Sequence, residues 1–264
     1  MGKPKSEYSI QTVSNALRLF EAFYEEDELG VSELARRLEL HKNNVFRLLA
    51  TLEQGGYIEQ SDENDLYRLG SRCLELGRAF TRGHSLLRCA RPILEELCEN
   101  SGESVHLGVL QDFEVVHLDG EQPSQLVVTA SRIGRRLPVH STALGKVLLG
   151  CSEESVREQF DRKFVSDSEL PRSSASTIVD GHKLFEHLRT VAVQGYAIDI
   201  EECAEGLCCA AAPVHDARGR VIAALSVSGP AYRLSEEDIL REIVPLVSAA
   251  ADRLSQELGH SSSS

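Results

Sequence analysis

Residues 31–56 read VSELARRLELHKNNVFRLLATLEQGG, and this stretch decides the fold of the N-terminal part of the chain. Its apolar residues recur at three- and four-residue spacing, as on the buried face of a helix, at Leu34, Ala35, Leu38, Val45, Leu48, Leu49 and Leu52. Ser32 is placed to cap a first short helix, a turn follows near Leu40-His41, and Gly55-Gly56 ends a second helix. The pattern predicts a helix-turn-helix.

The flanks of this stretch extend the prediction. An amphipathic helix is expected over residues 10–23, and two short β-prone runs follow at residues 57–59 and 66–69. The polar segment 61–65 between the two runs is typical of a hairpin turn. Together these elements predict a winged helix-turn-helix.

The exposed face of the second helix carries side chains suited to reading DNA. Asn43 and Asn44 can make paired hydrogen bonds to adenine, while Lys42 and Arg47 can reach guanine or a phosphate. The net charge of the chain is -13, but phosphate binding depends on local potential over about 10 Å, and Arg36 and Arg37 add to the local positive cluster. The alternative is a solvated face on an ordinary three-helix domain.

Beyond the wing, the sequence predicts a linker helix at 71–81, a packing helix at 86–100 and then a mixed α/β domain. Helices are expected at 141–150, 152–160, 180–194 and 235–258, and strands near 105–109, 115–116, 126–128, 208–214 and 221–228. The fold class is therefore α+β, with a DNA-binding domain over 1–70, a linker helix over 71–84, an α/β domain over 85–259 and a disordered tail over 260–264.

Composition narrows the class of protein. The absence of a long apolar run or an apolar leader predicts a cytoplasmic protein without membrane contact. The seven cysteines include no CxxC pair, so we expect reduced thiols, no disulfide framework and no metal site. No GxSxG elbow, P-loop or HExxH motif is present, so no catalytic residues and no cofactor are predicted.

From about Ser9 to Leu258, the chain resembles the IclR family of bacterial transcription regulators. Four stretches carry the resemblance: residues 31–38 with Arg47-Leu48-Leu49, residues 137–146 (LPVHSTALGK), Glu201-Glu202 through Glu205-Gly206-Leu207, and residues 224–230 (ALSVSGP). The resemblance implies a winged-helix domain joined by a helix to a GAF-like effector domain. It also implies homodimers, or dimers of dimers, on double-stranded operator DNA, controlled by a small-molecule effector.

Matched position by position, the resemblance implies that the effector-binding residues are Ala143, Leu144, Asp199, Cys209, Ser226 and Ser228. Their chemistry suits a small carboxylate or aromatic acid, since backbone N–H groups at a helix start can face a carboxylate and two serines at alternate strand positions share one face. Asp199 would repel a carboxylate, so it must bind a hydroxyl group, carry a proton or pair with a cation. Each residue could instead serve packing alone.

The sequence departs from the family pattern in the DNA-binding part. Asn43-Asn44 stands where relatives usually carry small hydroxyl residues. Because these positions are expected to contact bases, the operator sequence cannot be taken over from the relatives. The segment 62–65 is more acidic than a phosphate-facing wing tip, so we expect the wing to contribute little or to meet DNA through Arg68.

Parts of the sequence are compatible with two other functions. An enzyme could be built from Cys209, His140 and His215 as nucleophile and bases. A thiol- or metal-responsive regulator could use Cys203, Cys208 and Cys209 near His215, although apolar neighbours favour unreactive thiols.

For the metabolite-responsive regulator that we favour, the expected mechanism is that the effector changes the spacing of two recognition helices through the linker helix. The sequence does not indicate whether the regulator represses or activates transcription.

Overall fold

The computed structural model describes residues 9–24, 26–125, 132–165 and 169–261. The chain divides into two compact units, Met1–Gly83 and His84–Ser264, which are described separately. The strand expected at 126–128 and the tail residues 262–264 lie outside the described residues.

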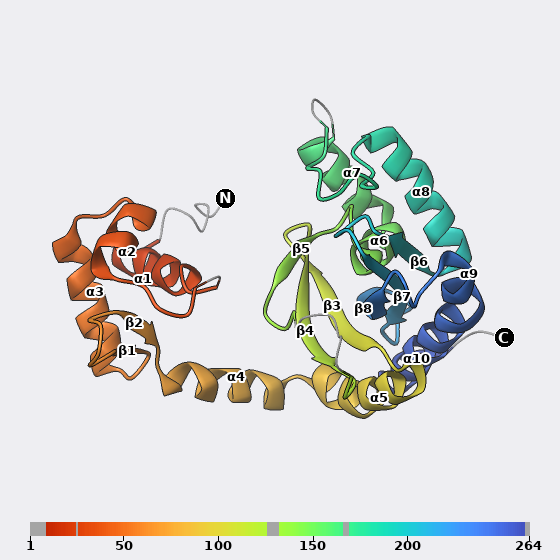
Figure 1. Ribbon diagram of the computed structural model, residues 1–264. Coiled ribbons are helices and arrows are strands. Elements are labelled where there is room, and N and C mark those ends of the chain that lie inside the picture. The colour runs from red at the N-terminus through yellow and green to blue at the C-terminus, as the bar shows by residue number, and fades with distance from the viewer. Residues whose placement is uncertain (1–8, 25, 126–131, 166–168, 262–264) are drawn as a thin grey trace. The chain divides into compact units, whose positions relative to one another are not determined.

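The N-terminal unit contains three helices before a small hairpin and a fourth helix after it (Figure 1). Its elements are α1 (Gln11–Glu21), α2 (Val31–Leu38), α3 (Lys42–Gln54), β1 (Ile58–Gln60), β2 (Tyr67–Leu69) and α4 (Ser71–Gly83). The core contains the predicted apolar positions of α2 and α3 together with Leu19, Phe23, Ile58 and Tyr67. Leu29 forms an isolated antiparallel bridge to Tyr67, so a third segment pairs with the wing.

The start of α2 differs from the sequence prediction. Gly30, with extended backbone, is the N-cap residue, and Ser32 is the second residue of the helix. The cap that Ser32 was expected to provide is therefore absent, because the helix begins one residue before it. Glu39, with φ 56°, ends the helix in the left-handed conformation.

The C-terminal unit contains a six-stranded antiparallel sheet in the order β5-β4-β3-β8-β7-β6. The strands are β3 (Ser104–Gln111), β4 (Glu114–Glu121), β5 (Arg136–Pro138), β6 (Ala197–Ile200), β7 (Leu207–His215) and β8 (Val221–Pro230). The helices are α5 (Ser85–Ser101), α6 (Ala143–Gly150), α7 (Glu154–Phe164), α8 (Gly181–Gln194), α9 (Glu236–Asp238) and α10 (Val244–Glu257), with a π-helical turn, η2 (Ile239–Ile243).

Alternation along the strands creates two cores. Cys208, Ala210 and Ala212 of β7 face α5, η2 and α10, whereas Cys209 and Ala211 face α6 and α8. Because α6 contacts β3, β4, β6, β7 and β8, the sheet wraps around this one helix (Figure 1).

Several predictions for this unit need correction. Strands β5 and β6 were not predicted, and the expected closing element over 235–258 consists of α9, η2 and α10. The expected helix at 141–150 begins at Ala143, where the Thr142 side chain accepts a hydrogen bond from the Gly145 N–H. His260 was expected in a disordered tail, but its ring stacks on His215 at 5.2 Å and contacts the Asp216 carbonyl.

Candidate functional site

The exposed face of α3 presents the polar residues expected to read DNA. The side chains of Lys42, Asn43, Asn44 and Arg47 are all exposed, opposite the buried Val45, Leu48 and Leu49. Asn44 and Arg47 border a groove between α3 and α1, whose other lining residues include Gln11, Thr12 and Asn15. This arrangement leaves both amides and both cations available to a partner.

The other basic residues predicted to contact DNA, Arg36, Arg37 and Arg68, are paired with carboxylates. Arg36 is held by Glu33 at 2.6 Å, and Arg37 pairs with both Glu33 and Glu26. Arg68 lies 3.5 Å from Glu59. Within residues 9–24 and 26–83, no ion pair involves Lys42 or Arg47, so the charges of these two α3 residues are available to a phosphate.

The sequence analysis did not include one residue of this face among the predicted DNA contacts. Phe46 lies between Asn43 and Arg47 on the exposed side of α3 and is 56% exposed. An exposed apolar ring beside polar base-reading groups can contact a thymine methyl group. The signal was available, because Phe46 falls off the spacing of the buried residues.

In the C-terminal unit, the sheet register aligns the polar residues of the expected effector site. Asp199 on β6 pairs with Cys209 on β7, Cys209 pairs with Ser228 on β8, and Ser228 pairs with Ser104 on β3. Antiparallel partners project to the same face, so these four residues form one row across four strands. Ser226 lies in the next row on this face, beside His106 and Ala211.

This face is covered and buried. Ala143 and Leu144 of α6 belong to the same cluster as Cys209, and all six expected effector contacts are at most 5% exposed. Yet the buried oxygens Ser104 Oγ, Ser141 Oγ and Asp199 Oδ2 have no hydrogen-bond partner among the described residues. Buried polar atoms without partners are rare in folded proteins and mark a place where a ligand or water completes the bonding.

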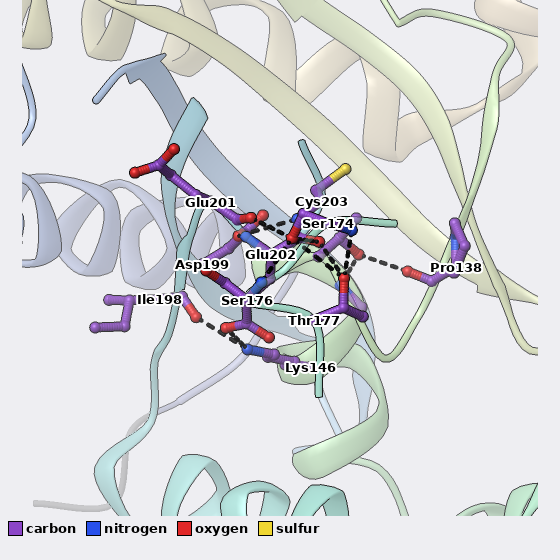
Figure 2. A network of polar contacts seen from close by, with 12 residues as sticks. Pro138, Lys146, Ser174, Ser176, Thr177, Ile198, Asp199, Glu201, Glu202 and Cys203 are labelled. Carbon is purple, nitrogen blue, oxygen red and sulfur yellow. Dashed lines mark hydrogen bonds and ion pairs between the residues drawn. The ribbon is translucent and has the colours of Figure 1, made fainter. Parts of the chain in front are cut away.

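A buried ion pair holds the edge of this site (Figure 2). Lys146 of α6 is fully buried, and its ammonium group pairs with Glu202 and donates to the Ile198 carbonyl at 3.3 Å. Asp199 Oδ1 accepts from the backbone N–H groups of Glu202 and Cys203 at 2.7 and 3.3 Å. Lys146 therefore fixes α6, β6 and the following loop to one another.

The same loop is tied to a second segment by hydroxyl groups. Ser174 Oγ donates to the Glu201 carbonyl at 2.6 Å, and Thr177 Oγ1 donates to the Glu202 carbonyl at 2.8 Å (Figure 2). Asp199 and Glu202 are thus positioned from several sides.

Two histidines of the face were not predicted from sequence. His106 on β3 and His117 on β4 are each 2% exposed, and their rings meet edge to face at 5.5 Å. Burial is the main cause that lowers the pKa of His106 to about 3 and that of His117 to about 4. Both rings are therefore neutral at pH 7, and Nδ1 of His117 has no partner among the described residues. A cleft of about 340 Å³ borders His106, Gly120 and Ile133.

The environment of Asp199 disfavours its ionised form. Burial raises its pKa from 3.8 to about 6, more than the backbone N–H donors of Glu202 and Cys203 lower it. The charged form is therefore destabilising in the folded state. The penalty is absent below pH 3.8, grows as the pH rises towards 6, and reaches at most about 3 kcal/mol above that.

We expect Asp199→Asn to stabilise the unliganded protein by up to about 3 kcal/mol at pH 8 and by little at pH 4, because asparagine carries no charge to desolvate. Urea unfolding at both pH values measures this difference. An equal effect at pH 4 and pH 8 would show that the charge of Asp199 is not the cause.

The cysteine and histidine residues considered for an enzyme, or for a thiol- or metal-responsive regulator, are not arranged for either function. Cys209 and His215 lie six positions apart on β7, which is about 20 Å along a strand, and His140 Nε2 contacts the Pro171 carbonyl. Burial raises the pKa of Cys203, Cys208 and Cys209, the opposite of a reactive thiol. Among the described residues, no three His, Cys, Asp or Glu side chains are grouped to hold a metal, and no helix is long and apolar enough to cross a bilayer.

Both units of the chain match models of known protein families. Residues 12–62 match the IclR helix-turn-helix domain model, and residues 79–256 match the model of the bacterial transcriptional regulator IclR C-terminal domain. The chain is 36% identical to the HTH-type transcriptional regulator KdgR of Escherichia coli, over 96% of this chain and 94% of the relative.

Solved structures agree with this match. A transcriptional regulator from Rhodococcus sp. RHA1 superposes with a TM-score of 0.83 at 27% identity, covering 95% of this chain and 98% of the other. An IclR homologue from Microbacterium hydrocarbonoxydans, complexed with 4-hydroxybenzoate, gives a TM-score of 0.79 at 27% identity, covering 94% and 98%. The predicted fold class is confirmed, and the matched relatives are regulators rather than enzymes. The chain belongs to the IclR family of bacterial transcription regulators.

Proposed function

We propose that this regulator binds a near-palindromic operator through α3, and that a small carboxylate or aromatic acid bound on the α6-covered face of the sheet changes its operator affinity. The observation that carries the proposal is the row Asp199, Cys209, Ser228 and Ser104, in which two buried oxygens have no partner among the described residues. Buried polar atoms are rarely left without partners in folded proteins, so these two oxygens are suited to hydrogen-bond a ligand.

On the DNA side, Asn43 and Asn44 are proposed to contact bases, and Lys42 and Arg47 to contact guanine or phosphate. Arg36, Arg37 and Arg68 are proposed to contribute less, because each is already paired with a carboxylate. A homodimer or dimer of dimers would present two α3 helices to two half-sites. The exposed apolar side chains of α4, Leu74, Leu76 and Phe80, support association with a second copy.

On the effector side, Ser226, Ser228 and Asp199 are proposed to hydrogen-bond the ligand, while Ala143, Leu144 and Cys209 shape the apolar wall. The relative complexed with 4-hydroxybenzoate supports an acid as the ligand class. Helix α4 is proposed to transmit the change to the DNA-binding unit, with a coupling of about 1–3 kcal/mol.

A thermal-shift screen of the full chain tests the pocket. The probes are 4-hydroxybenzoate, lactate and gluconate, and a probe at 100 times its Kd adds about 2.7 kcal/mol of stability. We expect at least one shift that Ser228→Ala abolishes and Ser176→Ala, a substitution of an exposed serine, retains. A shift that survives Ser228→Ala would place the ligand elsewhere.

A further inference from the structure

The polar face contains one cation that the family resemblance did not assign. Backbone bonds join the segment before β5 to β4: the Gly134 N–H donates to the His117 carbonyl at 2.8 Å, and the His117 N–H donates to the Arg135 carbonyl at 3.0 Å. Arg132 leads into this segment, and its Nη1 lies 4.0 Å from the Sγ of Cys203, in the loop after β6.

The position of Arg132 follows from the curvature of the sheet. Three strands, β3, β8 and β7, separate β4 from β6, which in a flat sheet is about 19 Å. A single side chain connects the two sides because the sheet curls around α6. The guanidinium group therefore lies beside the loop after β6, whose Cys203 N–H donates to Asp199 Oδ1 at 3.3 Å.

The bonding of this guanidinium is incomplete. Within residues 9–24, 26–125, 132–165 and 169–261, no carboxylate pairs with Arg132, and a thiol at 4.0 Å is a weak partner for a group with five N–H donors. Of the nearby acids, Glu202 pairs with Lys146 and Asp199 Oδ1 accepts from two backbone amides, and neither forms an ion pair with Arg132. A partly buried arginine without an acid is suited to bind an anion.

The neighbouring groups define the rest of the ligand. His106 and His117 are neutral, and the charge of Arg132 itself contributes to lowering the pKa of both rings, so they offer hydrogen bonds and no second positive charge. Asp199, whose Oδ1 accepts from the N–H of the same Cys203, would repel a second carboxylate but can accept a hydrogen bond from a hydroxyl group through Oδ2.

We infer that Arg132 binds the carboxylate of the effector, and that the effector is a monocarboxylate whose hydroxyl group is directed at Asp199. The inference rests on the proposed function, because it needs the effector to occupy this face of the sheet. Arg132 thereby selects for charge, and the row of serines and Asp199 selects for hydroxyl groups.

Acid and amide pairs test this assignment in the full chain by calorimetry: 4-hydroxybenzoate with 4-hydroxybenzamide, lactate with lactamide, and gluconate with gluconamide. At least one acid is expected to bind about 10- to 100-fold more tightly than its amide, the size of a charge-assisted contact. Arg132→Gln should remove this preference and Arg132→Lys should retain part of it. Arg135→Gln, which changes an exposed neighbour, should retain all of it.

Three results would overturn the inference: equal affinity for acid and amide, unchanged preference in Arg132→Gln, or no binding by any acid of the panel. If acid and amide bind equally and both lose binding in Ser228→Ala, the proposed pocket stands and only the role of Arg132 is removed. If no acid or amide binds and no probe changes operator affinity, the proposed function fails as well.

Discussion

Replacing Lys146 with methionine is expected to lower the free energy of unfolding of the C-terminal unit by about 3–5 kcal/mol. The ammonium group is fully buried, and its removal leaves the largely buried carboxylate of Glu202 without its counter-charge. The Ile198 carbonyl loses its donor at the same time. Urea unfolding of the full chain, followed by probes in each unit, measures the loss.

The pH dependence of this loss in stability shows whether the unpaired charge of Glu202 causes it. Burial already raises the pKa of Glu202 above 4.5, and Lys146 opposes that rise. Without Lys146 the pKa rises further, so the penalty is largest above this raised pKa and disappears as Glu202 takes up a proton at lower pH. Lys183→Met, at an exposed position of α8, is the control and should change stability by less than about 0.5 kcal/mol. A small and pH-independent effect of Lys146→Met would refute the role of the ion pair.

Arg47→Ala is expected to have the largest effect on DNA binding. A lost bidentate base contact costs about 1–3 kcal/mol, and a symmetric dimer loses it twice, for a total of about 2–6 kcal/mol in operator affinity. Arg36→Ala should cost less, because Glu33 already neutralises Arg36 at 2.6 Å. Fluorescence anisotropy with a labelled operator duplex compares the two variants.

The Arg47→Ala variant also tests the separation of the two units. Arg47 lies in the unit that ends at Gly83, whereas the effector row lies in the unit that begins at His84. Thermal shifts with the effector probes should therefore match the wild type. Loss of ligand binding in this variant would contradict the assignment of the two activities to separate units.

The N-terminal unit was largely predictable because its signals are local. Helical periodicity and the Gly55-Gly56 pair define α3, and the polar segment 61–65 separates two strands that do pair. The pairing of Arg36 and Arg37 with Glu33 was also readable, since the spacing is three and four residues. The pairing of Arg37 with Glu26, across a loop, was not.

The C-terminal site was predictable only through family resemblance. Strand β6 has four residues and β5 has three, too few for an alternating pattern to stand out. The row from Asp199 to Ser104 joins strands that lie up to 124 positions apart, so only the sheet register reveals it. The burial of Lys146, the pairing of His106 with His117 and the reach of Arg132 to Cys203 likewise depend on tertiary contacts.

The most direct test of the account is operator affinity measured with and without an effector. An operator is first selected from a random duplex library with the purified full chain, and its Kd is then measured while 4-hydroxybenzoate, lactate or gluconate is titrated. We expect a near-palindromic operator whose Kd changes about 5- to 150-fold with at least one acid, and a Ser228→Ala variant that binds the operator but no longer responds. An operator affinity that no acid changes, or a response that persists in Ser228→Ala, would contradict it.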